Sequence, residues 1–272
     1  MFDPYLQRWH LIPDGDAITS PSAHLLPVRQ NDVRCMLKLA LTAEEGRGGA
    51  ALAWWNGNGA AKVLARKGPA LLIERAECST SLSAMARSGK DDDACRIICD
   101  TVALLHARKA APPDGLVSLD RWFQDLWPVA KSRGGMLGDS ADAARHLLVG
   151  PQDIVVLHGD IHHGNVLDFG DRGWLAIDPK GLWGERAFDY ANIFLNPDLA
   201  RPARPVAVDQ RLFLRRLDIV TGMSGVARKR MLQWILAWCG LSAVWFLEEG
   251  MSAPINAKVA EMAAAELSRL SV

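Results

Sequence analysis

The segment "LHGDIHHGNVLDFGDRGWLAIDPKG" (Leu157–Gly181) concentrates acidic, amide and imidazole side chains between short apolar runs. It contains four aspartates, three histidines and one asparagine. The run "DIVVL" that leads into it is typical of a buried strand. "NVLDF" and "GWLAID" have the pattern of two more short strands joined by "GDR", which predicts a β-hairpin. The polar residues therefore occupy a loop between a buried strand and a small hairpin.

The predicted hairpin brings the amide of Asn165 close to the carboxylate of Asp178. Asn165 precedes the first strand and Asp178 ends the second, and a hairpin folds its own two ends together. Mg²⁺ prefers a few carboxylate or amide oxygens together with substrate phosphates. This arrangement leaves Asp160, on the same loop, free to take a proton from a hydroxyl nucleophile.

Longer motifs in the chain resemble a known enzyme family. "HGDIHHGN" followed by "WLAID" resembles the H-G-D-x-H-x-x-N and I-D signatures of aminoglycoside phosphotransferases, which share the protein-kinase-like fold. "WLAIDPKGLWGERAFDYANIFLNPD", "LPVRQNDVRCMLKLA" and "LAWWNGNGAAKVLA" are similar to streptomycin 6-kinases, a group often named aminoglycoside/hydroxyurea antibiotic resistance kinases. The resemblance, which covers nearly the whole chain, implies an ATP- and Mg²⁺-dependent phosphotransferase. Its acceptor would be a hydroxyl of a small molecule, foremost a cationic aminoglycoside such as streptomycin.

The fold implied by the resemblance is α+β and bilobal. A small β-rich N-terminal lobe (residues 1–77) would bind the nucleotide, and a larger, mainly helical lobe (residues 78–272) would carry catalysis and substrate binding. The sequence pattern agrees, because the first 76 residues are strand-rich and the part after Glu185 is mostly helical. "STSLS" (Ser79–Ser83) is the expected linker. The N-terminal strands are expected at Cys35–Ala40, Ala60–Arg66 and Pro69–Arg75.

The resemblance also assigns roles to individual residues. It implies that Asp160 is the catalytic base and that Asn165 and Asp178 hold Mg²⁺. It implies that Lys38, inside "CMLKLA", binds the phosphates of ATP, with Glu45 or Glu44 as its partner on a helix. The three glycines of "EEGRGG" each cost a helix about 1 kcal/mol relative to Ala. A helix is therefore predicted only over 50–55, and the pairing of Lys38 with Glu45 stays open.

The remaining nucleotide contacts follow from the same resemblance. It implies that the hinge Glu74–Glu77, with Glu74 and Ala76, meets adenine through its backbone. "TSPSAHLLP" (Thr19–Pro27) stands where protein kinases have a glycine-rich loop, and there Ser20 or Ser22 would offer a hydroxyl to phosphate.

The literal letters D-F-G, the name of a kinase metal motif, occur at Asp168–Gly170. Asp168 follows Asn165 by only three residues, before any hairpin can turn back. Asp178 has the spacing and the strand end that the metal site requires. We therefore expect Asp178, and not Asp168, beside Asn165.

Acidic side chains are the candidate contacts for a cationic acceptor. A guanidinium pairs with a carboxylate through two parallel hydrogen bonds, and streptomycin carries two guanidinium groups. Glu185 lies shortly after Asp178, and Glu248 and Glu249 end a long apolar helix. These three glutamates are the predicted substrate contacts; the alternative is that they are solvated surface charges.

Other functions remain open at this stage. His162 and His163 beside Asp160 allow a zinc hydrolase, because His and Asp clusters bind zinc. A catalytically inactive kinase-like binding protein and a kinase for another small metabolite are further alternatives. Structural roles are expected for His158, which would order the loop, and for Asp189, which would hold the loop backbone.

Composition argues against several classes of protein. The chain has 272 residues, 49% of them hydrophobic, and a formal net charge of zero, which argues against nucleic-acid or membrane-surface partners. Five cysteines without close pair spacing indicate buried thiols in a reducing compartment. The N-terminus lacks a secretory signal, so a cytoplasmic location is expected. Met231–Leu247 is apolar on every side and is predicted to be a buried core helix.

Overall fold

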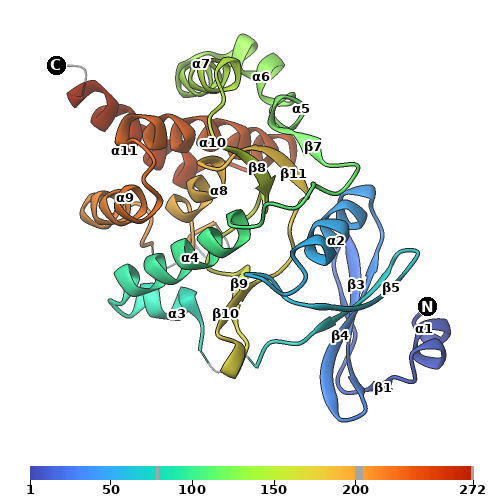
Figure 1. Cartoon of the computed structure of the whole chain (residues 1–272). Helices are drawn as coiled ribbons and strands as arrows, with labels where there is room; N and C mark the ends of the chain where they lie inside the picture. Colours follow the sequence, from blue (N-terminus) through green and yellow to red (C-terminus); the bar gives the residue numbers. More distant parts are fainter. Residues whose placement is uncertain (78–79, 200–204, 271–272) are drawn as a thin grey trace.

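The N-terminal part of the computed structural model is an antiparallel sheet that lies below and to the right of the helical part in Figure 1. The structure describes residues 1–77, 80–199 and 205–270. In the sheet the strand order is β1-β3-β4-β6-β5, with β2 paired to β3. The strands are β1 (Ile12–Pro13), β2 (Ile18–Thr19), β3 (Ala23–Gln30), β4 (Val33–Ala40), β5 (Val63–Lys67) and β6 (Ala70–Glu74).

Strand β4 has two different faces because successive side chains alternate across a sheet. Cys35, Leu37 and Leu39 are buried in a small core of their own, packed with side chains of α1 (Asp3–Arg8). Lys38 therefore points to the opposite face of the sheet, toward the rest of the molecule. This alternation places a cation on the inner face.

Helix α2 spans Ala43–Trp55. The glycines of "EEGRGG" had predicted a start at Ala50, which was wrong by seven residues. The hydroxyl of Thr42 caps it by accepting from the backbone N–H of Glu45 at 3.3 Å. Gly48 is required by a tertiary contact, since a Cβ there would lie 1.9 Å from the carbonyl oxygen of Pro179. The glycines cost helix propensity, but Gly48 lets α2 approach the loop that follows Asp178.

The C-terminal part is mainly helical, as predicted, and shares one large core. Its longest helix, α10 (Arg228–Glu248), has the length and composition to span a membrane, but 72% of its apolar stretch is buried, as in a core helix. The helices are α3 (Leu82–Arg87), α4 (Asp91–His106), α5 (Leu119–Trp122), α6 (Leu126–Arg133), α7 (Gly135–Val149), α8 (Phe188–Ala191), α9 (Gln210–Ser224), α10 (Arg228–Glu248) and α11 (Pro254–Arg269), with 3₁₀ turns η1 (Gly170–Arg172) and η2 (Asn192–Phe194).

Two small sheets carry the polar loop. Strand β8 (Ile154–Leu157) leads into it and pairs antiparallel with β11 (Leu182–Glu185), which also pairs with β7 (Val117–Ser118). The predicted hairpin is confirmed as β9 (Val166–Asp168) and β10 (Trp174–Ala176), which lies between the N-terminal sheet and the helices in Figure 1.

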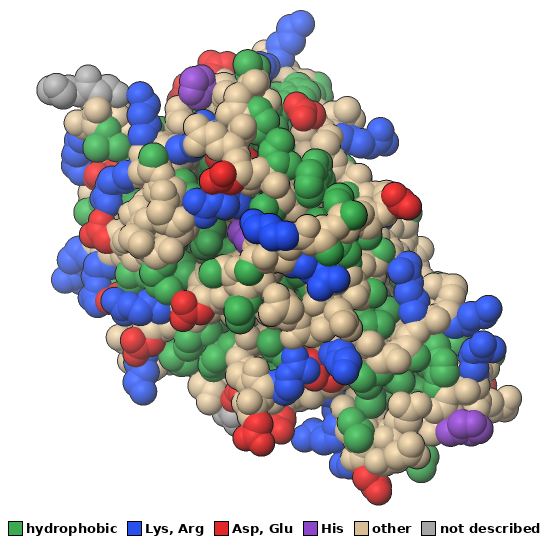
Figure 2. All heavy atoms as spheres, viewed as in Figure 1, with side chains coloured by type: hydrophobic (Ala, Val, Ile, Leu, Met, Phe, Trp, Pro, Cys, Tyr) green, Lys and Arg blue, Asp and Glu red, His purple; other side chains and the backbone are tan. Residues whose placement is uncertain are grey.

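The expected linker Ser79–Ser83 lies partly outside the described residues, because 78 and 79 are not described. Its remaining residues lead into α3, which Ser81 caps by accepting from the N–H of Ala84 at 3.4 Å. Four of the cysteines are described, and all four are free and buried; Cys78 lies outside the described residues. Figure 2 shows basic and acidic side chains interspersed over one face of the molecule, consistent with the zero net charge.

Candidate active site

The loop that follows β8 is held by a buried aspartate. Asp189, at the start of α8, is 2% exposed and accepts from the backbone N–H groups of His158 (3.0 Å) and Gly159 (2.8 Å). His106 lies 2.8 Å from the same carboxylate. The prediction that Asp189 holds the loop backbone is confirmed.

His158 orders the loop and the hairpin together. Its Nε2 donates to the carbonyl of Ile177 (2.8 Å), and its Nδ1 accepts from the backbone N–H of Asp160 (3.2 Å). One ring nitrogen therefore donates and the other accepts, which is the neutral form of imidazole. Burial lowers the pKa of His158 despite the nearby carboxylates of Asp189 and Asp160. Because both nitrogens are used by the backbone, His158 has the structural role that was predicted.

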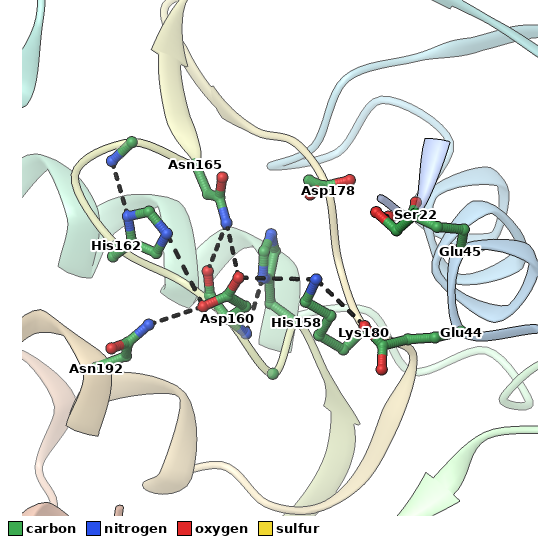
Figure 3. A network of polar contacts seen from close by, with 12 residues as sticks. Ser22, Glu44, Glu45, His158, Asp160, His162, Asn165, Asp178, Lys180 and Asn192 are labelled. Atoms are coloured by element: carbon green, nitrogen blue, oxygen red, sulfur yellow. Dashed lines mark hydrogen bonds and ion pairs between the residues drawn. The ribbon is translucent and has the colours of Figure 1, made fainter. Parts of the chain in front are cut away.

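Asp160 is oriented by two amide side chains from different elements (Figure 3). Asn192 Nδ2, in η2, donates to Oδ1 of Asp160 at 2.8 Å, and Asn165 Nδ2 donates to Oδ2 at 3.2 Å and to the Asp160 carbonyl at 2.9 Å. His162 Nε2 lies 3.8 Å from Oδ1. The carboxylate of Asp160 is thus held in one orientation within the loop that follows β8.

The hairpin brings Asn165 and Asp178 to one place, as its spacing predicted. The N–H of Ile177 donates to the Asn165 carbonyl at 2.9 Å. Asp178 adopts a φ of 61°, a left-handed conformation that Asp tolerates better than most residues and that concentrates at functional sites. Asp168 lies on β9 away from this pair, where its Oδ1 accepts from the N–H of Gly170 at 2.9 Å.

Lys38 joins the N-terminal sheet to the hairpin. Its ammonium forms ion pairs with both Glu45 of α2 and Asp178. Ser22 donates to the other Glu45 oxygen at 2.8 Å. Of the two candidates, Glu45 is therefore the partner of Lys38. Burial acts to raise the pKa of Asp178, but the adjacent Lys38 ammonium outweighs it and the pKa is lowered.

These side chains line a cavity of about 260 Å³ between the inner face of the sheet, α2 and the hairpin. It is lined by Ser22, Lys38, Glu45, Asn165 and Asp178. We call it the donor pocket, because the resemblance predicts that these residues bind ATP, the phosphoryl donor, and its Mg²⁺. The segment after β6 borders the hairpin, since the N–H of Glu77 donates to the Asp168 carbonyl at 2.9 Å.

Glu74 and Ala76, which the resemblance assigns to the hinge, lie at the end of β6 and in the segment after it. The carboxylate of Glu74 lies 3.1 Å from Arg172 of the hairpin and accepts from the Lys62 N–H at 2.5 Å. Ala76 packs beside the small apolar cluster that includes Phe169. Both therefore lie where sheet, hinge and hairpin meet.

A second cavity, of about 490 Å³, opens on the other side of Asp160. We call it the acceptor pocket, because Asp160, the predicted catalytic base, lines it. Three tryptophans form one wall: Trp122 lies next to Trp245 (ring centroids 5.4 Å apart), and Trp245 lies next to Trp238 (5.5 Å). Trp122 comes from α5, and the other two come from α10. The wall is thus built by helices far apart in sequence.

The sequence analysis missed the tryptophan wall and two further residues of this site, Asn192 and Lys180. Trp238 Nε1 donates to Asn192 Oδ1 at 2.9 Å, which turns the Asn192 amide so that its Nδ2 faces Asp160. Lys180 Nζ lies 3.3 Å from Glu44 and 3.9 Å from Asp160. Burial acts to lower the pKa of Lys180, but the surrounding carboxylates, Asp160 first, raise it. Only the position of Lys180 two residues after Asp178 was a signal in the sequence.

The family of this chain follows from its similarity to known proteins. Residues 8–250 match the family model of aminoglycoside/hydroxyurea antibiotic resistance kinases. The chain belongs to this family. It is 51% identical to the streptomycin 3''-kinase of Klebsiella pneumoniae over 90% of this chain and 92% of that protein. It is 30% identical to the streptomycin 6-kinase of Streptomyces glaucescens (93% and 84%) and 33% identical to the hydroxyurea phosphotransferase of Kitasatospora aureofaciens (90% and 72%).

Solved structures of distant kinases share the fold of this chain. A choline/ethanolamine kinase family protein from Mesorhizobium loti has a TM-score of 0.64 at 15% identity, covering 98% of this chain and 96% of that one. An aminoglycoside phosphotransferase in complex with ADP and hygromycin B has a TM-score of 0.63 at 11% identity (96% and 97%). The predicted protein-kinase-like α+β fold is confirmed.

Within this kinase, the predicted substrate contact Glu185 is misplaced. Strand β11 pairs Leu182 with Leu157 and Glu185 with Ile154, so Glu185 lies at the end of the sheet far from the loop that carries Asp160. Its oxygens accept from Arg230 (2.5 and 2.6 Å), Trp234 (2.9 Å) and the Gln152 N–H (3.0 Å). The carboxylate is 2% exposed and fully engaged in a structural ion pair. Glu185 therefore does not line the acceptor pocket.

The other predicted glutamates lie outside the pocket wall. Glu248 and Glu249 are exposed at the end of α10, about one helical turn beyond Trp245. They are not among the described residues that line the acceptor pocket.

A zinc site gains no support from the histidines of this kinase. Both nitrogens of His158 are used by the backbone, and Nδ1 of His162 accepts from the Gly164 N–H at 2.9 Å. Among the described residues there is no group of three or more His, Cys, Asp or Glu side chains placed to hold a metal ion.

Proposed function

We propose that this chain transfers the γ-phosphoryl group of ATP to a hydroxyl group of streptomycin or a closely related guanidino aminoglycoside, with Mg²⁺ as cofactor. Similarity to streptomycin kinases supports the acceptor. The observation that carries the proposal is the meeting of two pockets at one short row of side chains, from Lys38 through Asp178 and Asn165 to Asp160. In this proposal residues 1–77 form the nucleotide-binding lobe and residues 78–272 form the catalytic and substrate-binding lobe.

The donor pocket has the charges that a nucleotide triphosphate needs. Lys38, held by Glu45, would bind the inner phosphates, and Ser22 would offer its hydroxyl nearby. The backbone of the hinge at Glu74 and Ala76 would meet adenine. Ser22, Lys38 and Glu45 all line this cavity, which supports their roles. Ile73, the residue before Glu74, lines it as well.

The residues at the hairpin end fit Mg²⁺. Because Asn165 Nδ2 is committed to Asp160, its Oδ1 is left on the side away from Asp160 (Figure 3). Together with the Asp178 carboxylate it supplies two hard oxygen ligands of the kind Mg²⁺ prefers, the rest coming from phosphates and water. When bound, Mg²⁺ neutralises charge that develops on the transferring phosphates.

Asp160 would act on the acceptor. Its carboxylate, fixed by Asn192 and Asn165, orients the acceptor hydroxyl and accepts its proton. The oxygen of that hydroxyl forms a bond to the γ-phosphorus while the bond from this phosphorus to the β–γ bridging oxygen breaks and ADP leaves. The protein contributes mainly position and electrostatics.

The acceptor pocket suits a large organic cation. Guanidinium groups stack on tryptophan faces, which is worth about 0.5–2 kcal/mol per contact. The wall of Trp122, Trp238 and Trp245 offers such faces, and Asp160 and Glu44 add negative charge at its edge. Glu248 and Glu249 remain in the proposal as exposed charges near the pocket that attract a cation only weakly.

A coupled assay of ADP release tests the proposal. Purified protein with ATP and Mg²⁺ is offered streptomycin, hydroxyurea and an uncharged cyclic polyol in parallel. Streptomycin is expected to be the preferred acceptor, and NMR of the product distinguishes the 6 from the 3'' hydroxyl. Preference for hydroxyurea or the uncharged polyol would reject the proposed acceptor, and absence of ADP release with every acceptor would leave a nucleotide-binding protein without transferase activity.

A further inference from the structure

Lys180 is an unexpected residue in the acceptor pocket. Among the described residues that line this pocket, it is the only lysine or arginine. Its ammonium lies 3.3 Å from Glu44 Oε1 and 3.9 Å from Asp160 Oδ2, and its side chain is 20% exposed. A fixed cation repels a cationic acceptor, so acceptor binding does not account for it.

The backbone around Lys180 is rigid. Its N–H donates to the His158 carbonyl at 2.7 Å. The next residue, Gly181, has a φ of 69° and packs against α2, where a Cβ would lie 3.0 Å from the backbone of Arg47. The backbone of Lys180 is therefore held in place, and its side chain extends toward Asp160.

The position of Lys180 lies beside the path of the phosphoryl group. Asp178, two residues earlier, lines the donor pocket, whereas Lys180 lines the acceptor pocket. Figure 3 shows Lys180 between Asp160 and Glu44, with Asp178 nearby. A group that moves from the first pocket to the hydroxyl held at Asp160 must pass within reach of the ammonium.

We propose that Lys180 binds the equatorial oxygens of the γ-phosphoryl group during transfer, and that Glu44 holds its side chain when no phosphoryl group is present. This inference rests on the proposed function. In the step, the acceptor oxygen bonds to phosphorus, the bond to the bridging oxygen of ADP breaks, and the acceptor proton goes to Asp160. Lys180 keeps its protons throughout and contributes charge where charge develops.

The alternative is a purely structural ion pair that ties α2 to the loop. Both Lys180→Gln and Glu44→Gln remove that pair, so a structural role predicts similar losses in the two variants. A role in transfer predicts that Lys180→Gln lowers kcat about 10²-fold, the usual scale for one transition-state donor, and at least tenfold more than Glu44→Gln does.

The decisive measurement is binding of ADP with Mg²⁺, with and without aluminium fluoride, which imitates the transferring phosphoryl group. In the wild type aluminium fluoride is expected to tighten ADP binding. Lys180→Gln should lose most of this gain while its affinity for ADP alone stays within about threefold. Lys180→Arg, which keeps the charge, should retain part of the gain. Lys258→Gln, an exposed lysine on α11, is the matched control.

Each outcome has a clear meaning. If Lys180→Gln and Glu44→Gln lose the same gain, or if neither loses any, Lys180 does not bind the phosphoryl group. Because the measurement needs no acceptor, it is independent of whether streptomycin is the substrate. A wild-type protein that fails to bind ADP would reject the proposed function itself.

Discussion

The donor and acceptor pockets lie on either side of Asp160 but are lined by different types of side chain. The donor pocket is enclosed by the N-terminal sheet, α2 and the hairpin, and ion pairs of Lys38 cross it. The acceptor pocket is larger and has a wall of neutral aromatic rings from α5 and α10. Phosphoryl transfer needs charges at fixed positions, whereas recognition of a bulky acceptor needs apolar area with a few polar groups. Changes in the tryptophan wall can therefore alter the acceptor without disturbing the donor side.

The largest effect is expected at the boundary of the two pockets. Asp160→Asn keeps the size of the side chain but removes the proton acceptor, so kcat should fall by about two to four orders of magnitude. The KM for ATP should change little, because Asp160 lines the acceptor pocket and not the donor pocket. Steady-state kinetics and ADP binding check this. Near-normal turnover would show that another group takes the proton.

The next effect separates the metal ligand from the literal D-F-G aspartate. Asp178→Ala removes a donor-pocket carboxylate, and Mg²⁺-dependent turnover should drop below detection or by at least about 10²-fold. Asp168→Ala, on the neighbouring strand, is the matched control and should stay within about threefold of wild type. Titration of both variants with Mg²⁺ provides the readout. Loss of activity in Asp168→Ala alone would reverse the assignment.

A smaller effect, confined to the acceptor, is expected in the tryptophan wall. Trp245→Leu preserves much of the apolar volume but removes the aromatic face, so the KM for streptomycin should rise about tenfold. The KM for ATP should not change. Trp127→Leu is the control, since Trp127 is half-buried on α6 and is covered by Arg145 outside the acceptor pocket. Equal changes in both variants would indicate loss of stability and not of a cation contact.

The difference between the pockets also explains what could be predicted from the sequence. Asn165 and Asp178 are joined by one short hairpin, so spacing alone brought them together. The contacts of Trp238 with Asn192 and of Lys180 with Glu44 join distant segments, and no local pattern announces them. The acceptor wall was missed for that reason.

Two errors of the sequence analysis have the same physical origin. The start of α2 was placed too late because helix propensity does not include the contact of Gly48 with Pro179. Glu185 was placed near the site because it is close to Asp178 in sequence, although β11 leads away from the loop. In both cases tertiary packing outweighed a local rule.

The smallest effect is expected at the exposed glutamates. Glu248 and Glu249 lie in solvent, where salt screens charges within about 8–10 Å. The double variant Glu248→Gln/Glu249→Gln should therefore raise the KM for streptomycin no more than about twofold, with the effect disappearing at high salt.

Glu185→Gln is the contrasting control. It breaks a buried ion pair with Arg230, so it should lower the free energy of unfolding by on the order of 3 kcal/mol. Its KM for streptomycin should stay unchanged at temperatures where it is folded. Measuring both variants by kinetics and by thermal unfolding separates the two roles. If the double variant instead raised the KM more than tenfold and Trp245→Leu did not, carboxylates near the mouth of the pocket would select the cation, and the aromatic wall would serve only to pack α5 against α10.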